Sequence, residues 1–331
     1  MKRDRSLDYA KGISIILLLY MHCGNPTDNY FKIIISSFFM VIFFLICGIL
    51  IYLKYPKGIR RTEVSKYIEK RSKQVLMPYF SFGSILILFF QGLHIIAGES
   101  LDLLKMIVKL ITFQGIESMW FLPCYLFAEI LFVLVLLKLE KKFRFLITSI
   151  FILFIVFLNL DQVSNIVLYR KIVLINIGVV LIYIGCLIAK YNLISEISMT
   201  TCLILSLICS YLAIKNGFIG LSNLDLSNTI LFFFNGIGLS CVILFLCKWI
   251  EKYRIPLLER FGQNTIVVLC TNNLFIEIIR LVDYKFAGNF LIQKGAIGDI
   301  IFTAIMVLVE YVVIVICDHK LWFLFGRGRK K

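Results

Sequence analysis

Charged side chains are scarce in this sequence. Asp, Glu, Lys and Arg make up 17% of its 331 residues, whereas hydrophobic residues make up 60%. Soluble domains usually contain about 25% charged and about 45–50% apolar residues. So few charges could not keep a water-soluble globule of this size dispersed. The composition therefore excludes a soluble nucleotide-fold enzyme and a disordered chain, and it predicts an all-α polytopic membrane protein.

The sequence also lacks a CxxC pair. Its ten cysteines lie mostly inside apolar runs, where cysteine behaves as a small polarizable hydrophobe. This pattern excludes a secreted disulfide scaffold and a zinc site, so the sequence predicts no bound metal.

Signals of processing or of extra domains are missing as well. The apolar run after the basic start contains Asp8, Lys11 and His22 and no A-x-A-like cleavage site, so we expect the first span to be retained. No repeat and no low-complexity tract occurs, and the loops are short. We therefore expect a single transmembrane domain over residues 1–331, with no appended soluble domain.

Ten apolar runs are long enough to cross a hydrocarbon core of about 30 Å. They predict a bundle of about ten transmembrane helices at 8–26, 33–53, 75–96, 119–137, 145–160, 172–189, 194–214, 228–247, 263–280 and 297–317. A shorter segment, 101–112, carries Asp102, Lys105 and Lys109 at helical spacing among apolar residues. This spacing predicts a helix that lies in the membrane interface.

The basic residues predict the orientation of the bundle. With a cytoplasmic N-terminus, 25 of the 35 Lys and Arg residues fall on the cytoplasmic side and nine on the other, with Lys11 at a helix edge. Because basic loops favour the cytoplasm, we expect both termini there, in a multi-pass protein of the cell (plasma or inner) membrane. The formal charge of +15 then reflects topology and contact with membrane lipid, and no nucleic-acid partner is expected.

Lys11 and His22 lie on one stripe of the first predicted helix. Eleven residues separate them, which corresponds to three helical turns plus about 20° and to an axial offset of about 16 Å. If Lys11 lies at the cytoplasmic edge, His22 lies near the middle of the bilayer. Two interpretations of His22 remain open: a histidine hydrogen-bonded inside the bundle, or a general base or transient acyl carrier.

Five short motifs follow one another along the chain. The first is a basic residue, ten intervening residues and a histidine, formed by Lys11 and His22. The others are Phe43-Phe44-Leu-Ile-Cys47-Gly48, Lys70-Arg71-Ser-Lys73-Gln74 before Pro78-Tyr79, Met119-Trp120-Phe121-Leu122, and Gly262-Gln-Asn264-Thr265. In this order, and across nearly the whole chain, they resemble the acyltransferase-3 family of integral-membrane acyltransferases.

The resemblance implies an acyl-CoA-dependent O-acyltransferase. Such an enzyme moves an acyl group, usually acetyl, from a cytosolic acyl-CoA to a hydroxyl of an acceptor outside, here a cell-surface polysaccharide or another envelope glycan. Acyl-CoA, normally acetyl-CoA, is then a donor substrate, and no permanently bound cofactor is implied. We expect His22 to deprotonate the acceptor or to accept the acyl group, and Lys11 to position the thioester arm or its phosphates.

The loop 54–74 is the expected donor-binding segment. It carries eight Lys and Arg residues against Glu63 and Glu69, and such a patch attracts phosphates. Arg71 is the strongest candidate because a guanidinium makes paired hydrogen bonds to phosphate, and Lys70 and Lys73 are weaker candidates. The alternative is a cytoplasmic loop that contacts anionic lipid.

Two residues of the fourth predicted span are further site candidates. Glu129 lies nine residues after Trp120, about 13.5 Å deeper in a helix. Its carboxylate either orients His22 or another basic group, or makes a buried structural hydrogen bond. Trp120 is either an aromatic residue of the membrane interface or a surface on which an acceptor sugar stacks.

The chain departs from the family pattern at two places. The family's late-span motif often ends in a histidine, where this chain has Asn272 and Asn273, and its basic motif often has a second arginine, where this chain has Gln74. These departures leave an alternative open: a glycan or lipid exporter that kept the fold without the chemistry. Intramembrane Lys, His and Glu residues also suit a transport pathway.

Overall fold

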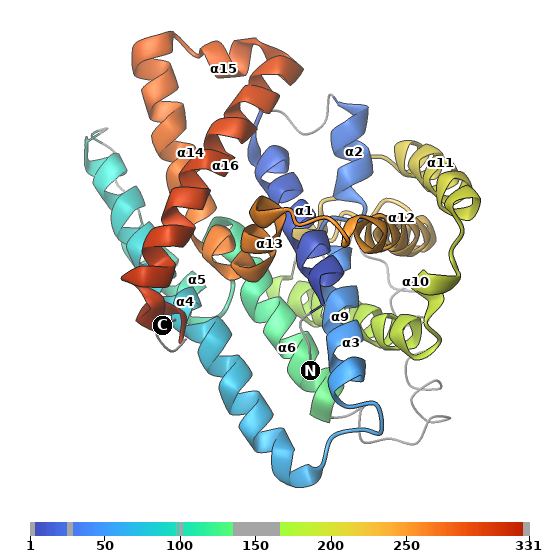
Figure 1. The fold of residues 1–331 in the computed structure, drawn as a ribbon. Helices are drawn as coiled ribbons and strands as arrows, with labels where there is room; N and C mark the ends of the chain where they lie inside the picture. Colours follow the sequence, from blue (N-terminus) through green and yellow to red (C-terminus); the bar gives the residue numbers. More distant parts are fainter. Residues whose placement is uncertain (1–3, 25–28, 97, 99–101, 135–165, 327–331) are drawn as a thin grey trace. The chain divides into compact units, whose positions relative to one another are not determined.

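The computed structural model describes residues 4–24, 29–96, 98, 102–134 and 166–326. Within these ranges the chain forms α-helices and short 3-10 turns, and no β-strand occurs beyond one isolated bridge between Gly220 and Asp225. The prediction of an all-α protein is confirmed (Figure 1).

Eight helical segments of the described chain are long and apolar enough to cross a membrane. They are Tyr30–Lys54, Thr62–Ile96, Glu117–Leu134, Val167–Lys190, Met199–Asn216, Thr229–Ile250, Thr265–Ala287 and Gly295–His319. Each overlaps one of the ten spans predicted from the sequence, so the protein is a multi-pass membrane protein. The cytoplasmic placement of both termini stays a prediction.

The two remaining predicted spans have different outcomes. The run 8–26 forms helix α1 (Arg5–His22), but the helix ends four residues earlier than predicted and carries Arg5, Asp8 and Lys11. With three charged residues among its 18, α1 is not one of the eight segments above. The run 145–160 lies outside the described residues.

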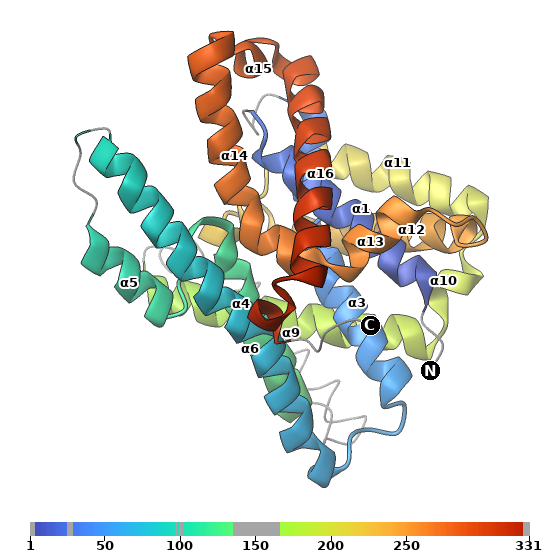
Figure 2. The same ribbon diagram turned by 60° about the vertical axis from the view of Figure 1, so that its left-hand side comes forward.

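The described chain divides into two compact units. The first contains α1 up to Met21, α2 (Tyr30–Ser36), α3 (Val41–Lys54), the later part of α6 (Phe121–Leu134), and α9 to α13. Those last helices are α9 (Val167–Lys190), α10 (Leu193–Glu196), α11 (Met199–Asn216), α12 (Thr229–Ile250) and α13 (Pro256–Gln263), with the turn η3 (Leu221–Asn223) before α12. Within this unit α3 packs against α9, and α11 packs beside α12 (Figures 1 and 2).

Glycines allow the helices α3 and α9 to touch backbone to backbone. A Cβ at Gly48 would lie 1.9 Å from the carbonyl oxygen of Ile182, and a Cβ at Gly185 would lie 2.1 Å from that of Leu45. Each helix therefore has a glycine that packs directly against the backbone of the other helix. Small residues at such contacts are typical of helix pairs in membranes.

The first half of α1 is in similar contact with α13. A Cβ at Gly12 would lie 2.3 Å from the carbonyl oxygen of Leu258, and a Cβ at Gly262 would lie 1.8 Å from that of Asp8. The hydroxyl of Tyr9 also donates to the carbonyl of Tyr253 at 2.8 Å. These contacts fix the part of α1 that carries Lys11.

The second unit contains residues His22–Gly24, most of α4 (Arg61–Ile96), α5 (Leu103–Ile111), the turn η1 (Glu117–Trp120) and the C-terminal helices. Of the latter, α14 (Thr265–Ala287) and α16 (Gly295–His319) form an antiparallel hairpin through the short α15 (Phe290–Gln293), and η4 (Trp322–Phe325) follows (Figures 1 and 2).

Helix α5 forms in the segment 101–112, where the charge spacing predicts a helix. It packs along the apolar half of α4 rather than apart from it: a Cβ at Gly83 would lie 2.3 Å from a methyl carbon of Leu110. The Tyr79 hydroxyl donates to the carbonyl of Leu110 at 2.9 Å and accepts from the amide of Gly115 at 3.1 Å. One buried side chain thus satisfies backbone groups on both sides of the turn after α5, as non-helical backbone in a membrane domain requires.

Candidate functional site

Lys11 forms an ion pair within α1. Its Nζ lies 2.8 Å from Oδ1 of Asp8, at the i, i+3 spacing of a helix. The Asp8 side chain is 4% exposed and that of Lys11 is 20% exposed. The ammonium is therefore held in one place by a buried carboxylate, and it reaches the surface only in part.

We expect Lys11→Ala to lower thermal stability more than the double variant Lys11→Ala/Asp8→Asn. The single change leaves a buried carboxylate without its cation, a loss worth about 3–5 kcal/mol when both partners are fully buried. Because Lys11 keeps some solvent contact, we expect a smaller cost here. Thermal unfolding of the purified proteins in detergent measures it, and equal melting temperatures for the single and double variants would contradict the prediction.

His22 is the last residue of α1, and its side chain is half-buried. The guanidinium of Arg280, from α14, donates to the backbone carbonyl of His22 at 3.1 Å. The same guanidinium pairs with Glu277 at 2.8 Å, so its direction is fixed by its own helix. The final carbonyls of a helix have no partner inside the helix, and a cation is favourable there. Arg280 therefore anchors the backbone that carries the candidate histidine.

The three basic candidates of α4 differ in their surroundings. Lys70 and Lys73 are exposed, and Lys73 pairs with Glu69 at 2.8 Å, where both side chains are 64% exposed. Arg71 is half-buried and donates to Oε1 of Gln74 at 3.0 Å. The departure at Gln74 thus removes a second cation and supplies an acceptor that orients the first. Of the three, Arg71 is the residue held in a defined geometry.

Trp120 ends η1 next to a tight turn. Gly115 has a φ of +81°, and a Cβ there would lie 2.3 Å from the backbone nitrogen of Trp120. The half-buried indole meets the ring of Phe121 edge-on, with centroids 6.0 Å apart. The turn therefore holds the indole in place. Stacking of an acceptor sugar on this indole stays a prediction, as does its alternative, an aromatic residue of the membrane interface.

Glu129 is buried in α6, with 1% of its surface exposed. Burial of a carboxylate in a membrane span is costly, so the residue has a structural or a functional partner. Its proposed action on His22 stays a prediction.

A buried polar cluster joins η1 to α14. The Ser118 hydroxyl lies 3.0 Å from Oδ1 of Asn272 and accepts from Nδ2 of Asn273 at 3.0 Å. Asn272 is fully buried, and its Nδ2 has no hydrogen-bond partner within the described ranges. The two asparagines that stand where the family pattern has a histidine thus form hydrogen bonds with the segment just before Trp120.

Comparison with known proteins decides the class of protein. The sequence model of the acyltransferase-3 family, described as an acyltransferase domain, matches residues 4–317. The chain belongs to this family. No curated protein and no solved structure matches it.

Two motifs of this acyltransferase are explained by packing. Gly48 of the second motif packs against the backbone of α9, and Gly262 of the fifth motif packs against the backbone of α1 at Asp8. Gly48 and Gly12 are thus points of close packing between helices. The fifth motif therefore contributes to the site indirectly, because its glycine fixes the helix turn that pairs Asp8 with Lys11.

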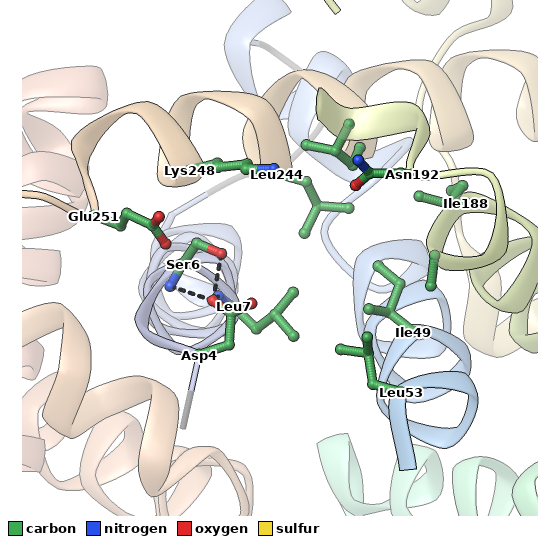
Figure 3. Close-up of a pocket in the computed structure, with 12 residues that line it drawn as sticks. Asp4, Ser6, Leu7, Ile49, Leu53, Ile188, Asn192, Leu244, Lys248 and Glu251 are labelled. Carbon is green, nitrogen blue, oxygen red and sulfur yellow. Dashed lines mark hydrogen bonds between the residues drawn. The ribbon is translucent and has the colours of Figure 1, made fainter. Parts of the chain in front are cut away.

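The acyltransferase also has a cavity of about 180 Å³ in its first unit (Figure 3). Its polar lining residues are Asp4, Ser6, Asn192, Lys248 and Glu251, and its apolar ones include Leu7, Ile49, Leu53, Ile188 and Leu244. Ile49, Leu53 and Ile188 lie across the cavity from Asp4 and Ser6 (Figure 3). None of the predicted site residues lines it. Ligand pockets usually have about 300–1,000 Å³, so we assign this cavity no substrate.

Two buried charges of the acyltransferase were not singled out from the sequence as site candidates. Lys32, one of the nine basic residues expected on the side opposite the cytoplasm, is fully buried in α2, with Nζ 5.0 Å from the ring centroid of Tyr20. Glu310, in α16, is fully buried and accepts a hydrogen bond from Thr271 at 2.8 Å. Residue type and position inside apolar runs were the available signals, and they cannot show burial. In the described chain, no three His, Cys, Asp or Glu residues are grouped to hold a metal ion.

Proposed function

We propose that this protein is an O-acyltransferase of the cell membrane. It moves an acyl group, normally acetyl, from cytosolic acyl-CoA to a hydroxyl of a cell-surface polysaccharide or another envelope glycan. Family membership establishes an acyltransferase in general. The observation that carries the finer proposal is the histidine at the end of α1, anchored by Arg280 and in one continuous helix with the Lys11–Asp8 pair.

His22 is the proposed general base. The acceptor hydroxyl gives its proton to the imidazole while its oxygen attacks the thioester carbonyl of acyl-CoA. The carbon–sulfur bond breaks, the new ester forms, and the imidazolium returns the proton to the leaving thiolate, which leaves as free coenzyme A. In the alternative route the imidazole attacks the thioester carbonyl, the carbon–sulfur bond breaks, and the thiolate leaves as coenzyme A with the proton that the imidazole loses. The acceptor oxygen then attacks the acyl-imidazole, and its proton returns to the imidazole as the ester forms.

The donor is proposed to bind from the side of the basic motif. Arg71 is the best phosphate ligand there, because Gln74 already orients its guanidinium. With the N-terminus in the cytoplasm, Lys11 lies about 16 Å nearer that side than His22, along the axis of α1. A pantetheine arm that passes the Lys11–Asp8 pair would bring its thioester towards the imidazole.

We expect Arg71→Gln to raise the KM for acetyl-CoA and to leave kcat nearly unchanged. Hydrogen bonds to charged groups contribute about 1.5–3 kcal/mol, so the rise should be roughly 10- to 100-fold. Steady-state kinetics of coenzyme A release measures both constants. The matched control is Lys73→Gln, because Lys73 is exposed and already paired with Glu69. An equal effect of the two variants would contradict a specific role for Arg71.

The proposed reaction is tested with labelled substrate. Membranes that contain the full chain are incubated with acetyl-CoA labelled in the acetyl group, and label is then measured in the polysaccharide fraction of the envelope. Base-labile label in that fraction supports an ester on a glycan hydroxyl. Label in lipid or protein alone would contradict the proposed acceptor, and glycan export without release of coenzyme A would favour the exporter.

A further inference from the structure

The chain turns sharply directly after His22. Gly24 has a φ of +68°, a conformation that L side chains rarely adopt. The carboxylate of Asp299, from α16, fills the place where a side chain would begin: a Cβ at Gly24 would lie 1.9 Å from Oδ1. Asp299 is therefore in direct contact with the backbone two residues after the histidine.

Two charged residues hold this short segment from the same hairpin. Arg280 of α14 donates to the carbonyl of His22 at 3.1 Å, and Asp299 of α16 lies against Gly24. Because α14 and α16 pack side by side, both contacts come from one helical hairpin. Both contacts lie just after the imidazole-bearing side chain in the chain, at the carbonyl of His22 and at Gly24.

The placement of Asp299 is costly, and the cost calls for a function. It is 7% exposed and lies in a helix long and apolar enough to span the membrane. Ionisable residues inside such helices are rare and commonly serve a functional site. Capping of α1 does not account for it, because a carboxylate only accepts hydrogen bonds and cannot satisfy the last carbonyls of a helix.

We propose that Asp299 is a positioning residue for the acyl transfer. Its carboxylate fixes the His22–Gly24 turn, together with Arg280, and thereby fixes the direction in which the imidazole meets the thioester. Transfer requires the reacting groups to be aligned, and a displacement of about 1 Å costs roughly 100-fold in rate. This inference rests on the proposed role of His22 and adds a residue 277 positions away in the sequence.

The test compares two isosteric variants of equally buried acids. Asp299→Asn removes the charge beside Gly24. Asp283→Asn removes the charge of an acid that is 6% exposed and accepts the amide of Leu291, in the short helix that connects α14 to α16. The purified full chain in lipid nanodiscs is given acetyl-CoA, and the released thiol is measured over a range of donor concentrations.

We expect Asp299→Asn to lower kcat about 10- to 100-fold with an unchanged KM for acetyl-CoA, because donor binding is untouched. Asp299→Glu should restore part of the rate, since it returns the charge. Asp283→Asn should keep the kcat of the wild type even if it melts at a lower temperature. A purely structural role of Asp299 would instead lower stability and active fraction in both variants alike.

The outcomes separate this inference from the proposed function. Wild-type kcat in Asp299→Asn, with His22→Ala inactive, would overturn the inference alone. Full turnover in both variants would overturn the role of His22 and the inference with it. If Asp299→Asn does not fold, Arg280→Lys and Arg280→Gln test whether fixing the His22–Gly24 turn sets the rate. A lower kcat at constant KM, less severe in the lysine variant, supports the inference. Wild-type kcat in both variants overturns it.

Discussion

Replacement of His22 by alanine should abolish acyl transfer while the protein remains folded. General acid–base catalysis contributes about 10²- to 10⁴-fold to a rate, so the residual kcat should fall by at least two orders of magnitude. The fold should persist because the side chain is only half-buried and the Arg280 hydrogen bond goes to the backbone carbonyl, which alanine keeps. Coenzyme A release and label transfer to glycan, at equal expression, measure the effect.

The chain provides a matched control for this variant. His319 is the last residue of α16, as His22 is of α1, but its side chain is exposed. His319→Ala should therefore turn over acetyl-CoA at the rate of the wild type. Activity retained in His22→Ala would exclude both the general base and the acyl-histidine. An acyl group trapped on the wild-type protein, and lost in His22→Ala, would favour the covalent route.

Replacement of Gly48 by alanine should destabilise the fold of the first unit. The new Cβ would lie 1.9 Å from the carbonyl oxygen of Ile182 and 2.8 Å from the amide nitrogen of Cys186, and these are backbone atoms that cannot rotate away. Helices α3 and α9 must then separate. Overpacking of a well-packed interior costs about 1–3 kcal/mol, and a backbone contact belongs at the upper end of that range.

Gly92 supplies the control for the same chemical change. It also lies inside a helix, α4, but nothing is found within 4 Å of the place of its Cβ. Gly92→Ala should therefore leave the melting temperature unchanged or raise it, because alanine favours a helix over glycine by about 1 kcal/mol. Fluorescence-detected thermal unfolding in detergent compares the pair. Equal melting temperatures would show that α3 and α9 are not in backbone contact at Gly48.

Some features of this acyltransferase follow from local sequence. Apolar runs of membrane-spanning length predict the eight helices that are long and apolar enough to cross a membrane, because helix formation in lipid depends on the segment's own backbone hydrogen bonds. The pair of Asp8 with Lys11 follows from their i, i+3 spacing, and the Lys11–His22 offset follows from one continuous helix. The family resemblance also rests on such short local motifs, and it is confirmed.

Contacts between distant segments were decided by the tertiary structure. Arg280 reaches His22 across 258 positions, and Ser118 reaches Asn272 across 154. Helical periodicity shows which residues share a face of one helix, but it does not show which helix that face meets. The partner depends on how closely the backbones approach, and here glycines such as Gly48 and Gly262 permit contacts that no side-chain pattern specifies.

Because periodicity does not show which helix a face meets, the sequence also did not reveal the surroundings of some charged residues. Lys32 lies at the edge of an apolar run and is fully buried, with its Nζ over the ring of Tyr20. Asp299 is an acid in an apolar run and lies against Gly24. The sequence by itself determined the membrane class, the helices and the Lys11–His22 register, because each depends on residues close in the chain. Only the tertiary structure decided what contacts the backbone at His22, because Arg280 and Asp299 lie more than 250 positions away from His22 and Gly24 in the sequence.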